Sequence, residues 1–423
     1  MQPPWQTAGY LTSALQDARR RTLELVSDLS DEQLRVPLLP IINPIVWEMG
    51  HVGWFQERWA LRHVRGDAPL FEYADSLWDS AAVAHDTRWD LPLPSRAGTL
   101  NYLARVLDRV VDGLESRPLT ETDRYFCWLA IMHEDMHGEA LTYTRQTLGF
   151  TPPVGAGPAV PFESALRGDA EFAGGDFMLG ARQSERLVFD NEKWEHPVEI
   201  QPFAMARSAV TQGAFAEFVD DDGYRRPELW SEDGWQWRTR AQAVHPVYCI
   251  RDGQAWHTRI FDRVVPLNPD ATLIHVNWYE AEAFCRWAGR RLPTEAEWEF
   301  AAAGSMKRAF PWGDHAPAPA LAHLDSRSAG CVSAGAFDAG DTPEGIRQMI
   351  GNAWEWTSDD FGPYPGFVRD PYKEYSEPWF GSPYKVLRGG CWATRSRLIR
   401  NTWRNFYPKD RRDVFAGFRT CHV

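Results

Sequence analysis

A stretch rich in proline and glycine divides this chain of 423 residues into two parts with different sequence patterns. The segment GFTPPVGAGPAVP, at 149–161, contains four prolines and three glycines. Neither a helix interior nor a central strand tolerates this density, because proline lacks the backbone N–H and glycine adds conformational freedom. The segment predicts a linker at 151–164, between a first domain at 1–150 and a second domain at 165–423.

Before the linker, apolar residues recur every three or four positions, which is the period of an amphipathic helix. The fourth and longest of these segments runs from Thr122 to Leu148 and stops at Gly149, a residue that suits a left-handed helix cap. Four long helices joined by connections predict a four-helix bundle. The three earlier helices are marked by Leu11, Leu15, Ala18, Leu25 and Leu29, by a start after Asn43 and Pro44, and by Leu100, Leu103, Leu107, Val110 and Leu114.

After the linker, short strand-like runs alternate with Gly, Asp, Asn and Pro, and only two segments have a convincing helical pattern. One of them covers 278–288. The other begins at Thr294 and has Glu297 three residues later, which is the spacing of a capping box. We therefore expect a mixed α+β domain rich in loops, and a multidomain protein with an α part and an α+β part.

Charge and hydropathy argue against several kinds of partner. The 58 acidic residues outnumber the 45 Lys and Arg residues and give a net charge of −13, which argues against a nucleic acid or an anionic membrane. The chain start lacks the pattern of a secretion signal, and apolar stretches such as 126–132 are too short to span a bilayer. These features predict a cytoplasmic protein that acts on a small substrate. The six cysteines form no CxxC pair, so we expect reduced, mostly buried thiols.

The strongest local signal for chemistry is the motif HEDMH in the fourth helix. It places His133 and His137 four residues apart, so both imidazoles project from one face of the helix. Phe126, Ala130 and Leu141 continue that face, which predicts that it points into the bundle. Two neutral imidazoles in such a place could bind a divalent transition metal.

A third histidine, His51, lies in the second helix within WEMGHVGWFQERW, where aromatic neighbours indicate a position near the core. A bundle can bring side chains from facing helices onto one ion, and three imidazoles leave three positions open on an octahedral Fe(II). Zinc fits three histidines equally well on ligand chemistry alone. Glu57 and Glu134 are candidates for hydrogen bonds that orient an imidazole.

HEDMH also matches the HExxH pattern of zinc proteases, in which Glu134 would act as the general base. The sequence contains no evident downstream ligand pattern of that class. Another alternative is a set of structural histidines that bind no metal. The presence of the third histidine favours a metal site over a set of structural histidines.

Segments of both halves resemble known families. In the second half, GGDFMLG at 174–180, LPTEAEWEFAAAG at 292–304, GNAWEWTSD at 351–359 and AGFR at 416–419 resemble the formylglycine-generating-enzyme (sulfatase-modifying factor) fold. The first half, with GHVGWFQE and the HxxxH helix, resembles a DinB-type helical bundle. In this order, the pair resembles the ergothioneine-synthase family of mononuclear non-heme iron sulfoxide synthases.

The resemblance implies a reaction and its partners. That family uses Fe(II) and O2 to join sulfur to C2 of the imidazole of hercynine, the Nα-trimethylated betaine of histidine. The resemblance implies that His51, His133 and His137 hold Fe(II), and that hercynine and O2 are substrates. Aromatic faces suit the fixed quaternary ammonium group of hercynine.

The resemblance also implies roles for residues outside the histidine cluster. Arg88, in DTRWD, is expected to bind a substrate carboxylate, with a surface position as the alternative. Tyr372 or Tyr375, in YKEY, is expected to donate a proton during oxygen activation, with aromatic packing as the alternative. The other substrate-binding candidates are Met136, Asn405, Phe406, Tyr407 and Arg411, of which Asn405 and Phe406 are expected to line the hercynine pocket.

Two positions depart from the pattern of the thiol-using members of that family. Those members commonly have Gln before the second His of HxxxH, where this chain has Met136, and RNW followed by Asp, where this chain has RNFY ending at Tyr407. An aspartate can neutralise the ammonium group of an amino-acid thiol, and a tyrosine cannot. Together with DSAAVAHDTRW at 79–89, these changes resemble the selenoneine synthases, whose donor is a selenosugar. Asp410 and Asp413 lie close in sequence and could restore the charge.

Three functions remain open. The first is an iron enzyme that joins hercynine to a selenosugar through a C–Se bond, or, within the same family, makes a hercynyl sulfoxide from γ-glutamylcysteine or cysteine. The second is a formylglycine-generating enzyme, although Cys391 and Cys421 lack the spacing of the copper-binding pair expected near its C-terminus. The third is a DinB-like binding protein without catalysis.

Overall fold

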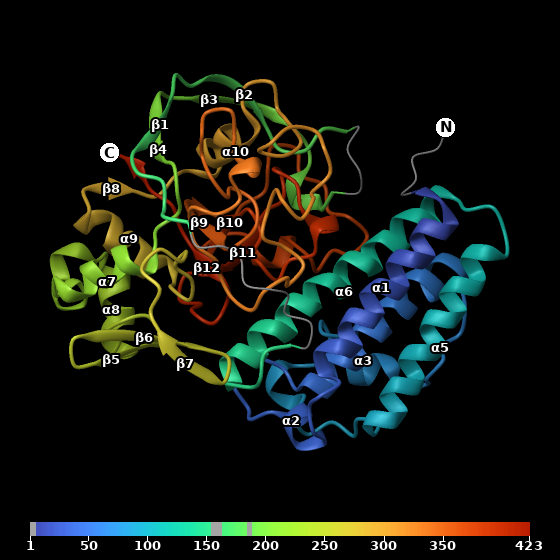
Figure 1. The fold of residues 1–423 in the computed structure, drawn as a ribbon. Helices are drawn as coiled ribbons and strands as arrows, with labels where there is room; N and C mark the ends of the chain where they lie inside the picture. The colour runs from blue at the N-terminus through green and yellow to red at the C-terminus, as the bar shows by residue number, and fades with distance from the viewer. Residues whose placement is uncertain (1–5, 154–162, 184–187) are drawn as a thin grey trace. The chain divides into compact units, whose positions relative to one another are not determined.

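The computed structural model describes residues 6–153, 163–183 and 188–423, and the chain forms two compact units (Figure 1). The first unit is Met1–Thr144 and the second is Arg145–Val423. Most of the linker expected at 151–164 lies outside the described residues.

The first unit is helical, as its sequence pattern predicts (Figure 1). Both α1 and α3 pack against α5, and buried side chains join α1 and α3 to α6. The helices are α1 (Ala8–Val26), α2 (Asp31–Arg35), α3 (Ile45–Gln56), the π-helix η2 (Glu57–His63), α4 (Ala74–Trp78), the 3-10 helix η3 (His85–Thr87), α5 (Arg96–Glu115) and α6 (Glu121–Leu148).

The ends of the long helices follow local sequence signals. Helix α1 begins where the side chain of Thr7 accepts a hydrogen bond from the backbone N–H of Tyr10. It ends before Leu29, so the expectation that Leu29 belongs to this helix is wrong, although the residue is buried in the core. Helix α6 ends where expected, because Gly149 adopts a φ of +66° that favours glycine.

Short strands pair into small sheets in the second unit (Figure 1). They are β1 (Asp169–Phe172), β2 (Gly175–Leu179), β3 (His196–Ile200), β4 (Phe203–Ala206), β5 (Cys249–Asp252), β6 (Ala255–Ile260), β7 (Arg263–Pro266), β8 (Arg290–Arg291), β9 (Trp354–Asp360), β10 (Tyr384–Arg388), β11 (Asn405–Pro408), β12 (Ala416–Gly417) and β13 (Cys421–His422). One sheet has the order β1-β4-β13-β8 and another has the order β11-β10-β9-β12, in which β9 and β12 are parallel. Strands β2 and β3 form an antiparallel pair, and β5, β6 and β7 form an antiparallel meander.

The second unit contains more helix than its sequence pattern predicts. Helices α9 (Trp278–Trp287) and α10 (Glu295–Ala303) lie where expected, and α10 opens with a capping box. In that box the Thr294 side chain accepts from the backbone N–H of Glu297, and the Glu297 carboxylate accepts from that of Thr294. The pattern does not predict α7 (Gln212–Asp220) or α8 (Glu232–Arg240), which are as short as α10 but lack the capping box that marks its start.

Tryptophan side chains fill much of the core of the second unit. Trp298, Trp354 and Trp356 are at most 1% exposed. The indole N–H of Trp298 donates to Oε2 of Glu355 at 2.8 Å, and Arg419 pairs with the same carboxylate at 2.7 Å. Large rings whose polar atom has a buried partner account for part of the high tryptophan content.

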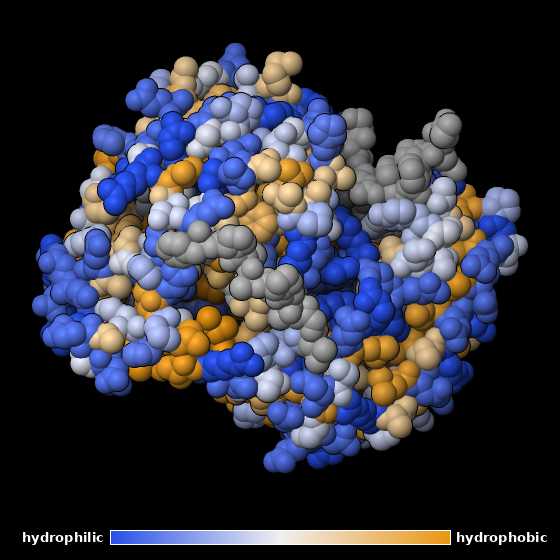
Figure 2. Space-filling view, viewed as in Figure 1, coloured by the Kyte–Doolittle hydropathy of each residue, from blue (hydrophilic) through white to orange (hydrophobic). Residues whose placement is uncertain are grey.

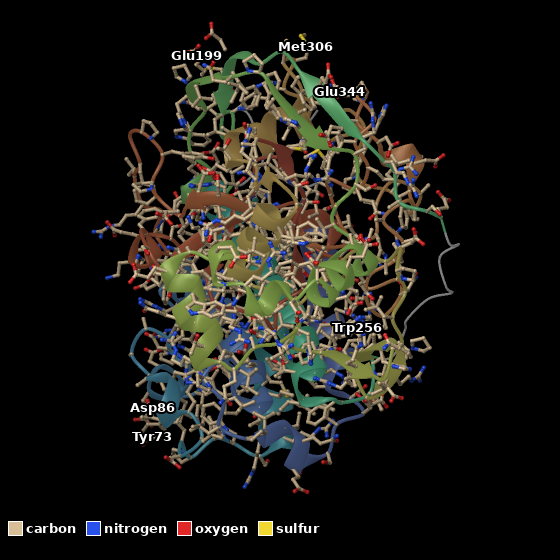
Figure 3. All side chains as sticks on the ribbon, turned by 90° about the vertical axis from the view of Figure 1, so that its left-hand side faces the viewer. Tyr73, Asp86, Glu199, Trp256, Met306 and Glu344 are labelled. Carbon is tan, nitrogen blue, oxygen red and sulfur yellow. The ribbon has the colours of Figure 1, made fainter. Side chains whose placement is uncertain are left out.

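Hydrophilic residues cover much of the face drawn in Figure 2, while isolated apolar side chains such as Tyr73 and Met306 project outward in Figure 3. In the part of the chain that the structure describes, no helix combines the length and the apolar character that a membrane crossing needs. All six cysteines are free thiols and four of them are buried, as expected.

Candidate metal centre

Three histidines from two helices of the first unit lie close together. His51 is on α3, and His133 and His137 are one turn apart on α6. One potential ligand atom of each lies within 4.8 Å of the others, and the Nε2 atoms of His133 and His137 are 3.2 Å apart. His51 and His133 are buried, while His137 is partly exposed. The structure therefore brings together the three histidines that the sequence singles out.

Neighbouring groups determine the orientation of His51. Its Nδ1 lies 2.8 Å from the carbonyl oxygen of Trp78, and since a carbonyl only accepts, Nδ1 carries the proton. The ring also stacks on Trp47, with centroids 4.8 Å apart and planes 11° from parallel. This leaves the lone pair on Nε2, and a carbonyl behind Nδ1 is a usual arrangement for a metal-binding histidine.

Different neighbours hold His133 and His137. The ring of His133 lies on that of Phe55, with centroids 3.5 Å apart and planes 4° from parallel. Nδ1 of His137 contacts Oε2 of Glu48, and since an ionised carboxylate only accepts, His137 donates from Nδ1. A carboxylate behind a histidine is a second common arrangement at metal sites, because it orients the ring and makes it more basic.

Burial and charge set the protonation of this cluster. Burial and then the neighbouring His137 lower the pKa of His51 to about 3, and burial also lowers the pKa of His133 well below its ordinary value. Burial by itself would raise the pKa of Glu48, but the charge and hydrogen bond of His137 outweigh it and lower this pKa to about 2. The neutral imidazoles of His51 and His133, together with a third imidazole backed by an ionised carboxylate, form a donor set that fits Fe(II) or Zn(II).

The two carboxylates expected to orient an imidazole have other partners. Glu134 accepts from Nε and Nη2 of Arg19 at 2.7 and 3.2 Å. Glu57 accepts from the backbone N–H of Leu70 at 2.6 Å and from the hydroxyl of Tyr102. The expectation for both residues is therefore wrong. The zinc-protease alternative loses its general base as well, because both carboxylate oxygens of Glu134 are engaged by Arg19.

Glu48 and Trp47 are the residues of this centre that the sequence reasoning missed. They precede His51 by three and four positions on α3, so all three lie on one side of the helix. Asn43 donates its side-chain amide to Oε1 of Glu48 at 2.5 Å and so steadies the carboxylate. The available signal was a glutamate one helical turn before a candidate ligand histidine.

Two of the predicted substrate-binding residues, Arg88 and Met136, lie in the first unit. Arg88 is 9% exposed, which excludes the alternative of a surface position. Its guanidinium lies 4.0 Å from the ring centroid of Trp47, and Nη1 donates to Oδ1 of Asn43 at 2.6 Å. Met136 is half-buried on α6, directly before His137.

The predicted proton donors and Phe406 lie in an aromatic group of the second unit. Tyr375 stacks on Phe189 with centroids 4.1 Å apart, and its ring lies 6.2 Å from those of Tyr372 and Phe406. Phe406 in turn stacks on Phe361 at 4.0 Å. Burial raises the pKa of Tyr375, so its phenol stays protonated at neutral pH.

The remaining predicted residues lie in and after strand β11. Asn405 and Tyr407 are half-buried residues of this strand, and the guanidinium of Arg411 lies 5.2 Å from the ring centroid of Tyr407. Arg411 donates to both carboxylate oxygens of Asp413 at 2.7 Å. Asp413 is buried and Asp410 is exposed. The carboxylate of Asp413 is therefore already neutralised by an arginine.

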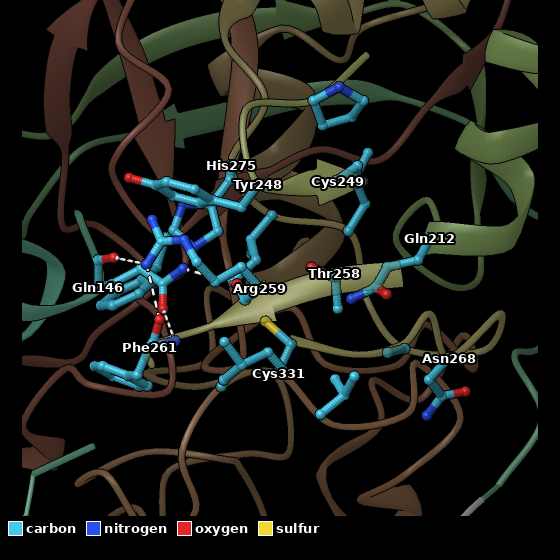
Figure 4. A pocket seen from close by; sticks show the side chains of 18 of the residues that line it. Gln146, Gln212, Tyr248, Cys249, Thr258, Arg259, Phe261, Asn268, His275 and Cys331 are labelled. Carbon is cyan, nitrogen blue, oxygen red and sulfur yellow. Dashed lines mark hydrogen bonds between the residues drawn. The ribbon is translucent and has the colours of Figure 1, made fainter. Parts of the chain in front are cut away.

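A cavity of about 150 Å³ also lies in the second unit (Figure 4). Tyr248, His275 and Cys331 are among its lining residues. Gln146 and Arg259 line it too, and they hydrogen-bond to each other's backbone carbonyls at 2.9 and 2.6 Å. None of the predicted site residues is among the described residues that line this cavity.

Two sequence families match the chain in the order of its two units. The DinB superfamily matches residues 14–142. The sulfatase-modifying factor enzyme 1-like domain matches residues 164–422.

The chain is also similar over nearly its whole length to hercynine oxygenases. It is 37% identical over 422 residues to the hercynine oxygenase of Mycolicibacterium thermoresistibile, covering 97% of this chain and 94% of that protein. It is 37% identical over 429 residues to that of Mycobacterium tuberculosis, covering 99% of each chain. The formylglycine-generating enzyme of Streptomyces coelicolor is 30% identical over 301 residues, covering 63% of this chain and 92% of that protein. This chain is an enzyme of the oxidoreductase class and belongs to the hercynine oxygenase family.

Proposed function

We propose that this enzyme uses Fe(II) and O2 to form a C–Se bond between C2 of the hercynine imidazole and a selenosugar, in selenoneine biosynthesis. Membership of the hercynine oxygenase family supports hercynine and O2 as substrates. The buried histidine cluster supports a metal ion in the first unit. The observation that carries the choice of donor is the ion pair of Arg411 with Asp413 beside Tyr407.

The proposed reaction balances with one O2 and no other oxidant. The C2–H bond of hercynine and the Se–H bond of the selenosugar break, and a C–Se bond forms. Two of the four electrons of the broken bonds remain in the C–Se bond. O2 takes up the other two together with a lone pair of selenium, so that one oxygen atom leaves as water with the two released protons and the other bonds to selenium as a selenoxide. A sulfur donor would give the corresponding sulfoxide by the same balance.

In this proposal, His51, His133 and His137 are the residues that would hold the iron. Bound iron supplies the redox partner that O2 needs. Tyr375, whose buried phenol keeps its proton, donates it as O2 is reduced, with Tyr372 as the alternative donor. The quaternary ammonium of hercynine suits the aromatic surroundings of Phe406, beside Asn405.

The charges near Tyr407 favour a donor without an ammonium group. An amino-acid thiol carries an ammonium group. Burying this charge without a carboxylate partner costs on the order of several kcal/mol. Asp413 is engaged by Arg411, and Asp410 points into solvent, so neither is placed as a ready partner for such a charge. Tyr407 can stack on a sugar ring and bond to its hydroxyls. Half-buried Met136 likewise contributes no polar group to an ammonium.

Two alternatives are less well supported. An ergothioneine synthase that uses γ-glutamylcysteine or cysteine fits the family equally well. However, this chain has Tyr407 at the position where such an enzyme is expected to have an aspartate. A formylglycine-generating enzyme explains only the second unit, since the similarity to that of Streptomyces coelicolor covers 63% of this chain. It also leaves the histidine cluster without a role.

The decisive experiment is anaerobic reconstitution with Fe(II), followed by oxygen uptake and product analysis with hercynine and a panel of donors. The panel holds a 1-seleno sugar, its 1-thio analogue, γ-glutamylcysteine and cysteine. We expect a much higher kcat/KM for the selenosugar than for the amino-acid thiols. The thio-sugar separates the effect of the sugar from that of selenium. A preference for γ-glutamylcysteine would assign the protein to ergothioneine synthesis instead.

A further inference from the structure

Arg88 is held inside the first unit by contacts within its own fold. Its Nη1 donates to Asn43 at 2.6 Å, and its Nη2 donates to the backbone carbonyl of Val83 at 3.1 Å. Its flat face lies over Trp47 at 4.0 Å. Its Nε is buried and has no hydrogen-bond partner among the residues that the structure describes. Because its contacts within the fold fix the guanidinium in place, Arg88 is suited to orient the groups that it touches.

The first path from Arg88 to the histidine cluster runs through Trp47. The indole contacts the guanidinium and also stacks on the imidazole of His51, at a centroid distance of 4.8 Å. The indole N–H donates to the carbonyl of Leu77 at 2.7 Å, which limits rotation of the ring. The orientation of the Trp47 ring therefore restricts that of the His51 ring, and the guanidinium of Arg88 packs against the same indole.

The second path runs through hydrogen bonds to His137. The Asn43 amide accepts from Arg88 with Oδ1 and donates to Glu48 with Nδ2. Glu48 then accepts from Nδ1 of His137 with its other oxygen. Every donor in this path meets an acceptor, which requires a single orientation of the amide. The orientation of the carboxylate behind His137 is thus linked to the position of the guanidinium.

We propose that Arg88 is a positioning residue of the metal centre, which orients His51 through Trp47 and His137 through Asn43 and Glu48. The inference rests on the proposed function only in that the three histidines bind one ion. Removing Arg88 would free both rings and weaken metal binding, even in the absence of hercynine, O2 and donor. Mutation of a residue that orients a ligand histidine typically lowers metal affinity by about 10- to 100-fold.

The test is an anaerobic titration of the purified apo protein with Co(II), a spectroscopic substitute for Fe(II), and then with Fe(II). We expect Arg88→Met to bind Co(II) at least about tenfold more weakly and to shift its visible absorption bands, because the ligand geometry changes. Arg96→Met is the matched control. Arg96 also donates to backbone carbonyls of the first unit, those of Leu29 and Val26, but none of its hydrogen bonds to the described residues reaches the histidine cluster.

Three further variants separate positioning from a general loss of fold. Asn43→Leu removes only the second path, so we expect weaker Co(II) binding with the stack on Trp47 kept. In Asn43→Leu combined with Arg88→Met, the losses should not add, because both variants break the same path. Arg88→Lys keeps the charge but loses the planar stack on Trp47 and the pair of Nη donors. Its Co(II) affinity should therefore lie between those of the wild type and Arg88→Met.

Each outcome is decisive. Wild-type Co(II) affinity and absorption in Arg88→Met would overturn the inference, and so would an equal loss in Arg96→Met. If Arg88→Met fails to fold, wild-type binding by Asn43→Leu would overturn it and weaker binding with an altered spectrum would support it. A wild-type protein that binds no metal would refute the proposed function itself. Metal binding without turnover of a selenosugar would refute the donor and leave the role of Arg88 intact.

Discussion

The imidazole of His133 lies flat on the ring of Phe55, with centroids 3.5 Å apart and planes 4° from parallel. The two residues come from α6 and α3, so this stack joins the two helices that carry the histidine cluster. A ring held in this way can rotate little, and its Nε2 lies 3.2 Å from Nε2 of His137. Such rigid support is what a metal centre needs before the ion arrives.

We predict that single alanine variants of His51, His133 and His137 lose bound iron and activity together. Removing one of three imidazoles should lower Fe(II) affinity by roughly a hundredfold or more, since no spare donor of the same kind faces the cluster among the described residues. Iron content after reconstitution and oxygen uptake measure the effect. His63→Ala is the control, because His63 packs on Trp59 and Phe126 and lies outside the cluster. Variants that keep stoichiometric iron and full turnover would contradict the assignment.

We predict that Tyr375→Phe, or else Tyr372→Phe, sharply reduces coupled product while hercynine binding hardly changes. The substitution removes the proton and keeps the ring, so the stack of Tyr375 on Phe189 persists. Single-turnover product analysis and hercynine titration separate the two effects. Tyr279→Phe, on α9, is the control. Normal turnover in both single variants and in the double variant would show that neither phenol is the proton donor.

We predict that Tyr407→Asp moves the donor preference toward γ-glutamylcysteine and cysteine. The new carboxylate would neutralise the ammonium of these thiols, and each 1.4 kcal/mol of the recovered interaction is worth about tenfold in selectivity. Competition between the selenosugar and γ-glutamylcysteine measures the shift. Asp410→Asn tests the exposed carboxylate nearby and should leave the preference unchanged. If Asp410→Asn lowers the use of amino-acid thiols instead, Asp410 is the ammonium partner.

We predict that Gly50→Ala destabilises the first unit and weakens metal binding. A Cβ at Gly50 would lie 2.1 Å from Nε1 of Trp78, whose carbonyl accepts from His51. Overpacking of this kind costs about 1–3 kcal/mol. Thermal unfolding of the apo protein and Co(II) titration report the two effects. Gly9→Ala is the control, because a Cβ there meets nothing within 4 Å and alanine favours a helix. An unchanged Tm and affinity in Gly50→Ala would contradict the close packing.

We predict that Asp359→Asn stabilises the protein at pH 8 but not at pH 4. Burial and then the charge of Glu295 raise the pKa of Asp359 to about 6 from 3.8, so the folded state binds the proton more tightly than the unfolded state. The contribution of Asp359 to the free energy of unfolding therefore falls as pH rises from about 4 to 6, and it stays low above that range. Asparagine cannot ionise and can still accept from the backbone N–H of Glu295. After discounting for solvent, we expect a difference on the order of 1 kcal/mol.

Denaturant unfolding at pH 8, 6 and 4 measures this difference between wild type and variant. The exposed residue Asp410 provides the control, since Asp410→Asn should show no such trend. A difference that stays constant from pH 4 to 8 would mean that Asp359 does not titrate in this range.

Most of the first unit could be predicted from the sequence. Long amphipathic periods, as in α5 and α6, specify a helix and its buried face locally, and Gly149 specifies where α6 ends. The i, i+4 spacing of His133 and His137 likewise places two imidazoles on one face without knowledge of the fold. The short helices α7 and α8 could not be predicted, because each has only nine residues and neither begins with the capping box that marks α10.

The sequence alone thus determined the helical and α+β parts and the three histidines, because each depends on residues a few positions apart. Only the tertiary structure decided which groups support the cluster. Glu134 was a candidate in sequence and Glu48 was missed, yet Glu134 pairs with Arg19, 115 positions away, while Glu48 reaches His137 across 89 positions. Partners this distant are chosen by how helices pack. Local sequence does not specify this packing, which places an arginine beside one glutamate and a histidine beside the other.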